Sequence, residues 1–241
     1  MPLPTVATPT YELKLPSSSK KIKYRPFLVK EEKVLIIALE SKSQSEITNA
    51  VKDVLKQCIL TKGIDVDELP TFDIEYIFLN IRAKSIGEAI KVRVTCPDDG
   101  ETEIPVTVYV DEIKVVKSKD HKTDIVLDDK MTLRMKYPSL NQFIENNFAT
   151  ADNSEEVVNK TFKVIADCMD TIYTEEDAWD VNDYTPSERI EFVEKLSSKQ
   201  YKEVEKFFAT MPKLSHTIEV INPNTKEKGS VILEGLADFF G

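Results

Sequence analysis

Residue types that can bind a metal or act on a substrate gather around a cysteine near the middle of the chain. The segment Cys96-Pro97-Asp98-Asp99-Gly100 has the outline of a zinc knuckle, with Asp99 in place of the second thiolate. A structural zinc ion needs four ligands, but no second cysteine pair follows, and His121 and His216 stand alone. We therefore expect no metal and no other cofactor. Instead, the segment predicts a turn in which Gly100 takes a positive φ and the aspartates accept hydrogen bonds from nearby backbone amides.

A second candidate for chemistry is the acidic stretch from Tyr173 to Tyr184. Together with Asp170 it holds six carboxylates, and it contains the only tryptophan, Trp179. Carboxylate oxygens are calcium ligands, but the stretch lacks the Asp-x-Asp-x-Asp-Gly order, the turn glycine and the closing glutamate of a calcium loop. We expect a solvated loop in which Trp179 packs inward.

Catalytic motifs are missing from the rest of the sequence. We find no nucleophile elbow, no phosphate-binding glycine loop, no His-Glu-x-x-His pair and no Ser, His and Asp set. With 6 glycines and 2 histidines the chain has little material for them. Paired carboxylates could cleave glycosides, but nothing singles out two of the 42 acidic residues. We predict that the protein is not an enzyme and has no catalytic residues.

Composition limits the binding partners. The 241 residues are 41% apolar and 8% aromatic, which suffices for one good core or two small ones. A net charge of -10 argues against binding nucleic acid or an anionic membrane, because both need a basic surface. The one basic cluster predicts a solvated hairpin face and comprises Lys20, Lys21, Lys23, Arg25 and Lys30.

The cysteines indicate the compartment. Their number is odd, no signal peptide is recognisable, and no apolar run is long enough to cross a bilayer, so we expect a reducing cytosol. Cys58 and Cys168 fall on apolar helix stripes, where a free thiol behaves as a small hydrophobe. We predict that both lie in the core.

Hydrophobic periodicity predicts an α+β fold in which short N-terminal, central and C-terminal β-hairpins pack with about six helices. Capping boxes begin helices at Ser43, Thr185 and Ser197, and a helix over Pro70–Lys84 is apolar enough to be buried on more than one side. Four regions follow from these patterns: an extended arm at 1–10, a hairpin plus helices at 11–85, a central β-hairpin region at 86–138, and a helical region at 139–241 that ends in a hairpin and an aromatic tail.

Aromatic and apolar residues gather at the C-terminal end of the chain. Leu236, Phe239 and Phe240 must either dock on their own domain or wait for a partner. The two alternatives stay open.

Short motifs stand in order along nearly the whole chain: Leu15-Pro16-Ser17, Tyr24-Arg25-Pro26-Phe27, Lys30-Glu31-Glu32-Lys33, Trp179, Tyr184-Thr185, Phe192, Leu196, Phe207-Phe208, Met211-Pro212-Lys213-Leu214, Gly235-Leu236 and Phe239-Phe240. They resemble the family of baseplate hub proteins from T4-like contractile-tailed bacteriophages, which includes a hub subunit and a hub assembly catalyst. The N-terminal part is also similar to tail assembly chaperones of other long-tailed phages.

The resemblance implies a non-enzymatic protein of the tail baseplate in the virion, present in the host cytoplasm during assembly. Its implied partners are other hub proteins and the tape measure protein, and a homo-oligomer within the hub stays open. The alternative is a transient assembly chaperone that is absent from the mature virion.

Seven residues are the candidate contacts of such a protein. The family pattern implies that Arg25, Phe27, Lys30 and Glu31 lie at or beside a contact surface. Of these, we expect Phe27 to be a core residue that orients the helix, which leaves Arg25 as the better interface candidate. At the other end of the chain, Leu236, Phe239 and Phe240 could be buried interface anchors.

Overall fold

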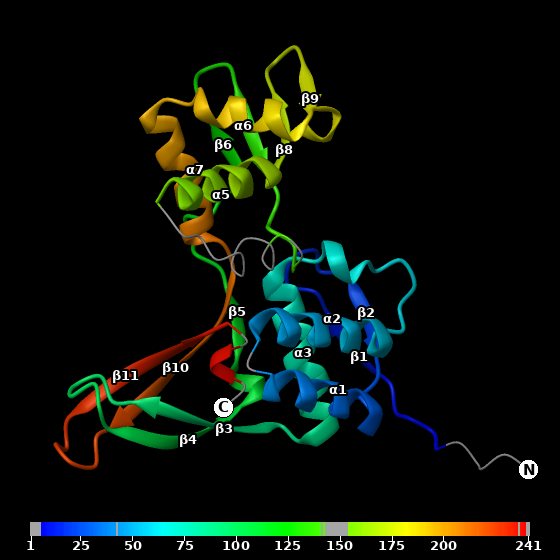
Figure 1. Ribbon diagram of the computed structural model, residues 1–241, viewed down its shortest axis with the longest axis vertical. Helices are drawn as coiled ribbons and strands as arrows, with labels where there is room; N and C mark the ends of the chain where they lie inside the picture. The colour runs from blue at the N-terminus through cyan, green and yellow to red at the C-terminus, as the bar shows by residue number, and fades with distance from the viewer. Residues whose placement is uncertain (1–5, 42, 141, 143–153, 236, 240–241) are drawn as a thin grey trace, which may run out of the picture. The chain divides into compact units, whose positions relative to one another are not determined.

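The computed structural model describes residues 6–41, 43–140, 142, 154–235 and 237–239 (Figure 1). These residues form six helices and eleven strands in small sheets, which confirms the predicted α+β class. The chain divides into two compact units. Unit 1 comprises residues 1–66, 72–116 and 213–241, and unit 2 comprises residues 67–71 and 117–212.

Unit 1 begins with the predicted N-terminal hairpin, in which strands β1 (Tyr11–Lys14) and β2 (Lys21–Tyr24) are antiparallel. Three helices follow, namely α1 (Val29–Glu40), α2 (Gln44–Cys58) and α3 (Thr71–Ile86), with the 3-10 turn η1 (Val66–Glu68) between the last two. The Ser43 hydroxyl accepts the Glu46 N–H at 3.4 Å, so the predicted N-cap is confirmed. The predicted capping box is incomplete, because the Ser43 N–H donates to the Ser41 hydroxyl at 3.2 Å instead of to Glu46.

Helix α3 is the central helix of unit 1. Its buried side chains cover more than one face, as the dense apolar pattern predicts: Phe72, Asp73, Ile74, Ile77, Phe78, Leu79, Ile81 and Ala83. The buried Asp73 carboxylate accepts hydrogen bonds from the Ser17 N–H, at 3.0 Å, and from the Ser17 hydroxyl. This pair fastens the turn of the N-terminal hairpin to α3.

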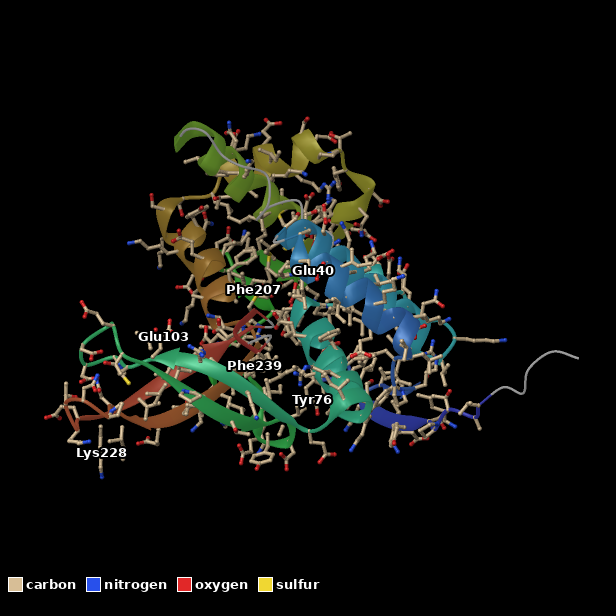
Figure 2. All side chains as sticks on the ribbon, turned by 60° about the horizontal axis from the view of Figure 1, so that its bottom comes forward. Glu40, Tyr76, Glu103, Phe207, Lys228 and Phe239 are labelled. Carbon is tan, nitrogen blue, oxygen red and sulfur yellow. The ribbon has the colours of Figure 1, made fainter. Side chains whose placement is uncertain are left out.

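Two long hairpins complete unit 1. Strands β3 (Ala89–Thr95) and β4 (Glu103–Tyr109) form one, and β10 (Lys213–Ile221) and β11 (Lys228–Glu234) form the other. Strand β10 also pairs with β5 (Lys114–Val116), which follows the 3-10 turn η2 (Val110–Glu112). The hairpins enclose a core with Leu79 and Ala83 of α3 and with Phe239 of the last turn, η4 (Ala237–Phe239), as Figure 2 shows for Phe239.

The cysteine-containing turn between β3 and β4 has the predicted form. Gly100 takes a φ of +68°, and the Asp99 carboxylate accepts the N–H groups of Glu101 and Thr102, both at 3.0 Å. The turn thus uses the aspartate as a backbone acceptor.

The same turn also joins the tips of the two hairpins. The Asn222 amide Nδ2 donates to Asp98 at 3.0 Å and to Asp99 at 2.8 Å. Gly229 faces Pro97 so closely that a Cβ at residue 229 would lie 2.6 Å from the Pro97 Cγ. Only glycine fits at this crossing.

Unit 2 is a four-stranded antiparallel sheet covered by helices. The strand order is β6 (Asp124–Val126), β7 (Thr132–Met135), β8 (Met169–Tyr173) and β9 (Ala178–Asp180). The helices are α5 (Ser154–Asp167), α6 (Pro186–Glu194) and α7 (Ser198–Thr210). Capping boxes at Thr185 and Ser197 begin α6 and α7, as predicted.

The acidic stretch differs from its prediction. Instead of a solvated loop, it forms the β8–β9 hairpin and the 3-10 turn η3 (Val181–Asp183), and Trp179 is 37% exposed rather than packed inward. A tight turn connects the two strands. In this turn the Thr174 N–H donates to the Asp177 carbonyl at 2.8 Å. A three-residue strand is too short to give a periodic signal, so the sequence pattern did not show it.

The cysteines are free thiols, and all three are fully buried. The prediction that Cys58 and Cys168 lie in the core is therefore confirmed. No helix in the described part of the chain is long and apolar enough to cross a membrane.

Candidate interaction surface

The chain between β2 and α1 is held against the end of α2 by backbone contacts. The Arg25 N–H donates to the Cys58 carbonyl at 3.0 Å, and the Leu60 N–H donates to the Lys23 carbonyl at 2.8 Å. These bonds extend β2 along the residues that follow α2, so the position of Arg25 is fixed before its side chain makes any contact.

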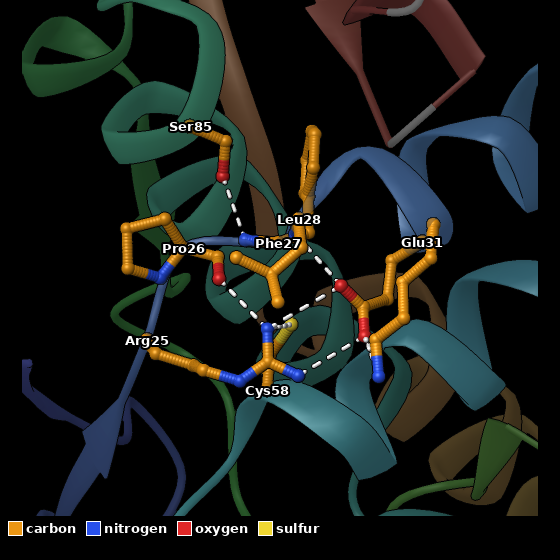
Figure 3. A network of polar contacts seen from close by, with 8 residues as sticks. Arg25, Pro26, Phe27, Leu28, Glu31, Cys58 and Ser85 are labelled. Carbon is orange, nitrogen blue, oxygen red and sulfur yellow. Dashed lines mark hydrogen bonds and ion pairs between the residues drawn. The ribbon is translucent and has the colours of Figure 1, made fainter. Parts of the chain in front are cut away.

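The Arg25 side chain forms the centre of a polar network (Figure 3). Its Nη2 lies 3.0 Å from Glu31 Oε1, and its Nη1 donates to the Pro26 carbonyl at 2.9 Å. The side chains of Arg25 and Glu31 are only 15% and 5% exposed. A guanidinium suits this position, because it can donate hydrogen bonds to a carboxylate and a carbonyl at once.

Glu31 also caps α1. Its Oε2 accepts the Leu28 N–H at 2.7 Å, which satisfies a free amide at the helix start. Burial raises the pKa of Glu31, but the hydrogen bonds from Arg25, Leu28 and Lys30 outweigh burial and hold it below its usual range. The Glu31 carboxylate in turn raises the pKa of Arg25. Both groups are therefore charged at neutral pH.

The neighbouring thiol is inert. Cys58 Sγ lies 3.7 Å from Arg25 Nη1, but burial raises the pKa of this thiol to about 11. Because the thiolate is the reactive form, Cys58 is not a nucleophile in this network.

Phe27 connects the same segment to the central helix. Its N–H donates to the Ser85 hydroxyl at 2.9 Å, and that hydroxyl donates to the Ile81 carbonyl within α3 at 2.6 Å. The Phe27 ring is buried, with 8% of the residue exposed. Through this bond to α3 and its buried ring, Phe27 therefore fixes the orientation of the start of α1.

Helix α1 turns an apolar face to solvent. Its inner side buries Glu31, Leu35 and Ala38. With about 3.6 residues per turn, Val29, Ile36 and Ile37 lie on the opposite side, where they are 79%, 50% and 56% exposed. Further exposed apolar residues flank them: Leu28, Val34 and Leu39. We call Val29, Ile36 and Ile37 with these flanking residues the α1 face.

Charged groups accompany this face. Lys30 is 68% exposed at its side chain, with its Nζ 3.3 Å from Glu31 Oε1, and Lys33 is exposed one turn further along. Glu40 is exposed on the same side of the helix as Lys33, so the charges at this face are of both signs and its apolar strip is what suits it to a partner.

The structure brings four of the seven candidate contact residues together. Arg25, Phe27, Lys30 and Glu31 all lie at the start of α1, where Arg25 and Glu31 hold the helix and the exposed Lys30 side chain pairs with Glu31. Phe239 is 1% exposed in the core between the two long hairpins. Leu236 and Phe240 lie outside the described residues.

The exposed residues of the α1 face were not among the candidates. Periodicity predicted a helix here but gave no sign of which side would stay uncovered. A signal was present, because seven of the twelve residues in Val29–Glu40 are Val, Leu, Ile or Ala and they surround the helix. A helix that is apolar all round is normally buried, so one at a protein surface indicates a partner.

Nothing at this surface indicates catalysis or metal binding. Across the described residues, no group of three or more His, Cys, Asp or Glu side chains is placed to hold a metal ion. The arrangement supports protein contact through an apolar helix that a buried ion pair keeps in position.

Residues 8–241 match a protein family described as T4 bacteriophage base plate protein. No curated protein matches the chain. No solved structure matches it either. The family match covers the α1 face and residues from both compact units.

Proposed function

The chain belongs to the T4 bacteriophage base plate protein family, and from this premise we propose that it is a non-enzymatic component of the baseplate hub that binds other hub proteins and the tape measure protein. Membership supports a structural role in the tail baseplate of the virion and contacts with other phage structural proteins. The α1 face is the observation that carries the proposal of a hub contact.

An exposed apolar helix favours association. Burial of apolar surface stabilises a complex by about 25 cal/mol per Å². Because Val29, Ile36 and Ile37 are each half-exposed or more, covering each of them would contribute on the order of 1 kcal/mol. The Arg25–Glu31 pair fixes the helix beforehand, so little further ordering opposes binding.

The proposed occupant of the α1 face is another hub protein with an apolar groove. A helix that places apolar residues seven positions apart, as Val29 and Ile36 are, fits the helix-in-groove mode of recognition. Lys33 and Glu40 place charges of both signs beside the face, so we expect apolar fit rather than net charge to select the groove.

Co-expression of the chain with the other hub proteins and the tape measure protein of the same phage tests this proposal. We expect Ile37→Glu to lower the affinity of the complex about tenfold or more, because it places a charge in an apolar contact. Ile232→Glu is the matched control, since Ile232 on β11 is 57% exposed and Ile37 is 56% exposed. Both variants should keep the melting temperature of the unaltered protein.

Equal affinity of the Ile37→Glu and unaltered proteins would reject the α1 face as the contact. Equal loss with both variants would reject it as well, because the effect would then follow from added charge alone. A complex that forms during assembly and is missing from finished particles would favour the transient chaperone.

A further inference from the structure

Unit 2 contains an apolar groove that the α1 face does not involve. The groove lies between α6 and the β8–β9 hairpin and has a volume of about 370 Å³. Its apolar lining is Met131, Met169, Ile172, Trp179, Val181 and Phe192. This volume is near the lower end of the about 300–1,000 Å³ that is usual for ligand sites, and it has room for one large apolar side chain and its neighbours.

Two aromatic residues stand at the groove with much of their surface in solvent. Trp179 is 37% exposed and Tyr184 is 42% exposed, and both line the groove. Tryptophan and tyrosine are enriched among the residues that dominate binding energy, because their large rings bury much area at a small cost in side-chain entropy.

Acidic side chains neighbour these rings in the sequence. Five carboxylates from the β8–β9 hairpin and from η3 are exposed: Glu175, Glu176, Asp177, Asp180 and Asp183. None of the five forms an ion pair with a lysine or arginine in the part of the chain that the structure describes. The nearby cations are already engaged, since Lys195 pairs with Glu191 at 2.7 Å and Arg134 pairs with Asp124 at 2.7 Å.

An arginine also contributes to the wall of the groove. Arg189 lines the groove, its Nη1 lies 3.6 Å from Asp167 Oδ1, and its Nε is buried without a hydrogen-bond partner. A buried donor left unpaired is costly. Because this Nε is closed off from solvent, it offers no hydrogen bond to a bound segment, and the proposal rests on the aromatic rings and the carboxylates.

We propose that this groove binds a short segment of another protein that carries one large apolar residue flanked by lysine or arginine. The apolar residue fills the groove against Trp179, and the basic residues face the carboxylates of the β8–β9 hairpin. Charge complementarity sets the choice of partner, because an acidic or neutral segment would meet five unpaired carboxylates.

The single tryptophan makes the groove directly observable. Because Trp179 is the only tryptophan in the chain, the intrinsic tryptophan fluorescence of the full-length protein reports this site alone. The probe is a synthetic peptide without tryptophan that has one phenylalanine between two pairs of lysines. Two matched peptides replace the phenylalanine by serine or the lysines by glutamates.

We expect the lysine–phenylalanine peptide to shift the emission to shorter wavelength in a saturable way, with an affinity that falls as salt rises. The serine and glutamate peptides should bind about tenfold more weakly or worse, because one lacks the apolar anchor and the other the charge. An unchanged emission at about 1 mM peptide would overturn the proposal, since affinity would then be negligible. Equal binding of all three peptides would overturn it too.

Variants separate the groove from the general acidity of the protein. The double variant Glu175→Lys and Glu176→Lys should weaken binding of the lysine–phenylalanine peptide, as judged by the same emission change. The control is Glu203→Lys with Glu205→Lys on α7, which changes the net charge equally and touches no residue of the groove. An equal effect of both doubles would mean that net charge alone attracts the peptide, which would reject the proposed site.

Discussion

At the scale of single residues, Glu31 makes two stabilising contacts at the start of α1. It pairs with Arg25 at 3.0 Å and accepts the Leu28 N–H at 2.7 Å, and both contacts are shielded from solvent. A side chain at this position that could make only one of the two contacts would leave either a buried charge or a free helix amide. We propose that Arg25 affects assembly by positioning α1, rather than by touching a partner.

We expect Glu31→Ala to lower the free energy of unfolding by about 3 kcal/mol, because it leaves the Arg25 charge and the Leu28 amide without their acceptor. Chemical denaturation followed by circular dichroism measures the change. Glu12→Ala is the control, since its pair with Lys23 spans 3.8 Å and both side chains are more than half exposed. That variant should cost less than about 1 kcal/mol. Equal costs would contradict the assigned role of Glu31.

The carboxylates of Asp98 and Asp99 at the hairpin tips should make the stability of the fold sensitive to acid. Hydrogen bonds from Thr225 and Asn222 lower the pKa of Asp98, and those from Thr102, Glu101 and Asn222 lower the pKa of Asp99. A carboxyl group whose folded pKa lies below its unfolded value of about 3.9 adds stability above that value, and this stability is lost as pH falls through the folded pKa.

The test compares Asp99→Asn with Glu101→Gln in the same turn. At pH 7 the Asp99 variant should melt at a lower temperature than the unaltered protein, and the gap should shrink below about pH 4, where the natural aspartate begins to lose its advantage. The Glu101 variant should match the unaltered protein throughout. A gap that stayed constant with pH would show that the Asp99 charge does not act through these bonds.

Features of single residues were predictable where a side chain forms hydrogen bonds with backbone groups a few positions away. The caps at Ser43, Thr185 and Ser197 span three residues, and the Asp99 turn is equally local. Contacts between distant residues were not predictable. The Ser17–Asp73 pair spans 56 positions and leaves no trace in either segment alone.

At the scale of elements, periodicity predicted the hairpins and the amphipathic helices, but not which surfaces would be covered. The α1 pattern predicts a helix and leaves its outer face undecided. The short strand β9 was missed, and so was the pairing of β10 with β5, in which Lys213 faces Val116 across almost a hundred residues of chain. Such pairings depend on tertiary contacts rather than on local sequence.

The last helical turn gives a prediction at this scale. Phe239 is 1% exposed and packs with residues of both long hairpins, so we expect Phe239→Ala to cost about 3–5 kcal/mol of unfolding free energy. Tyr109→Ala is the control, because this aromatic residue on β4 is 51% exposed. Thermal unfolding measures both.

A Phe239→Ala protein that keeps the stability of the unaltered protein but fails to join the hub complex would instead make Phe239 an interface anchor. Loss of stability in step with loss of the complex supports its place in the core.

At the scale of the whole molecule, two units with separate apolar cores each carry a surface suited to a partner. Unit 1 presents the apolar α1 face, which carries charges of both signs, and unit 2 presents the apolar groove at Trp179 with its acidic hairpin. A face of mixed charge and an acidic groove would direct different partners to each, as an assembly of several proteins requires. The overall acidity of the chain gave no sign of this difference.

The most direct test of the central claim is quantitative mass spectrometry of purified phage particles, with this chain measured against known tail proteins of the same sample. A built-in hub component predicts a small, fixed number of copies per tail. Absence from particles together with abundance in the infected lysate would contradict the claim and make the protein a transient assembly factor.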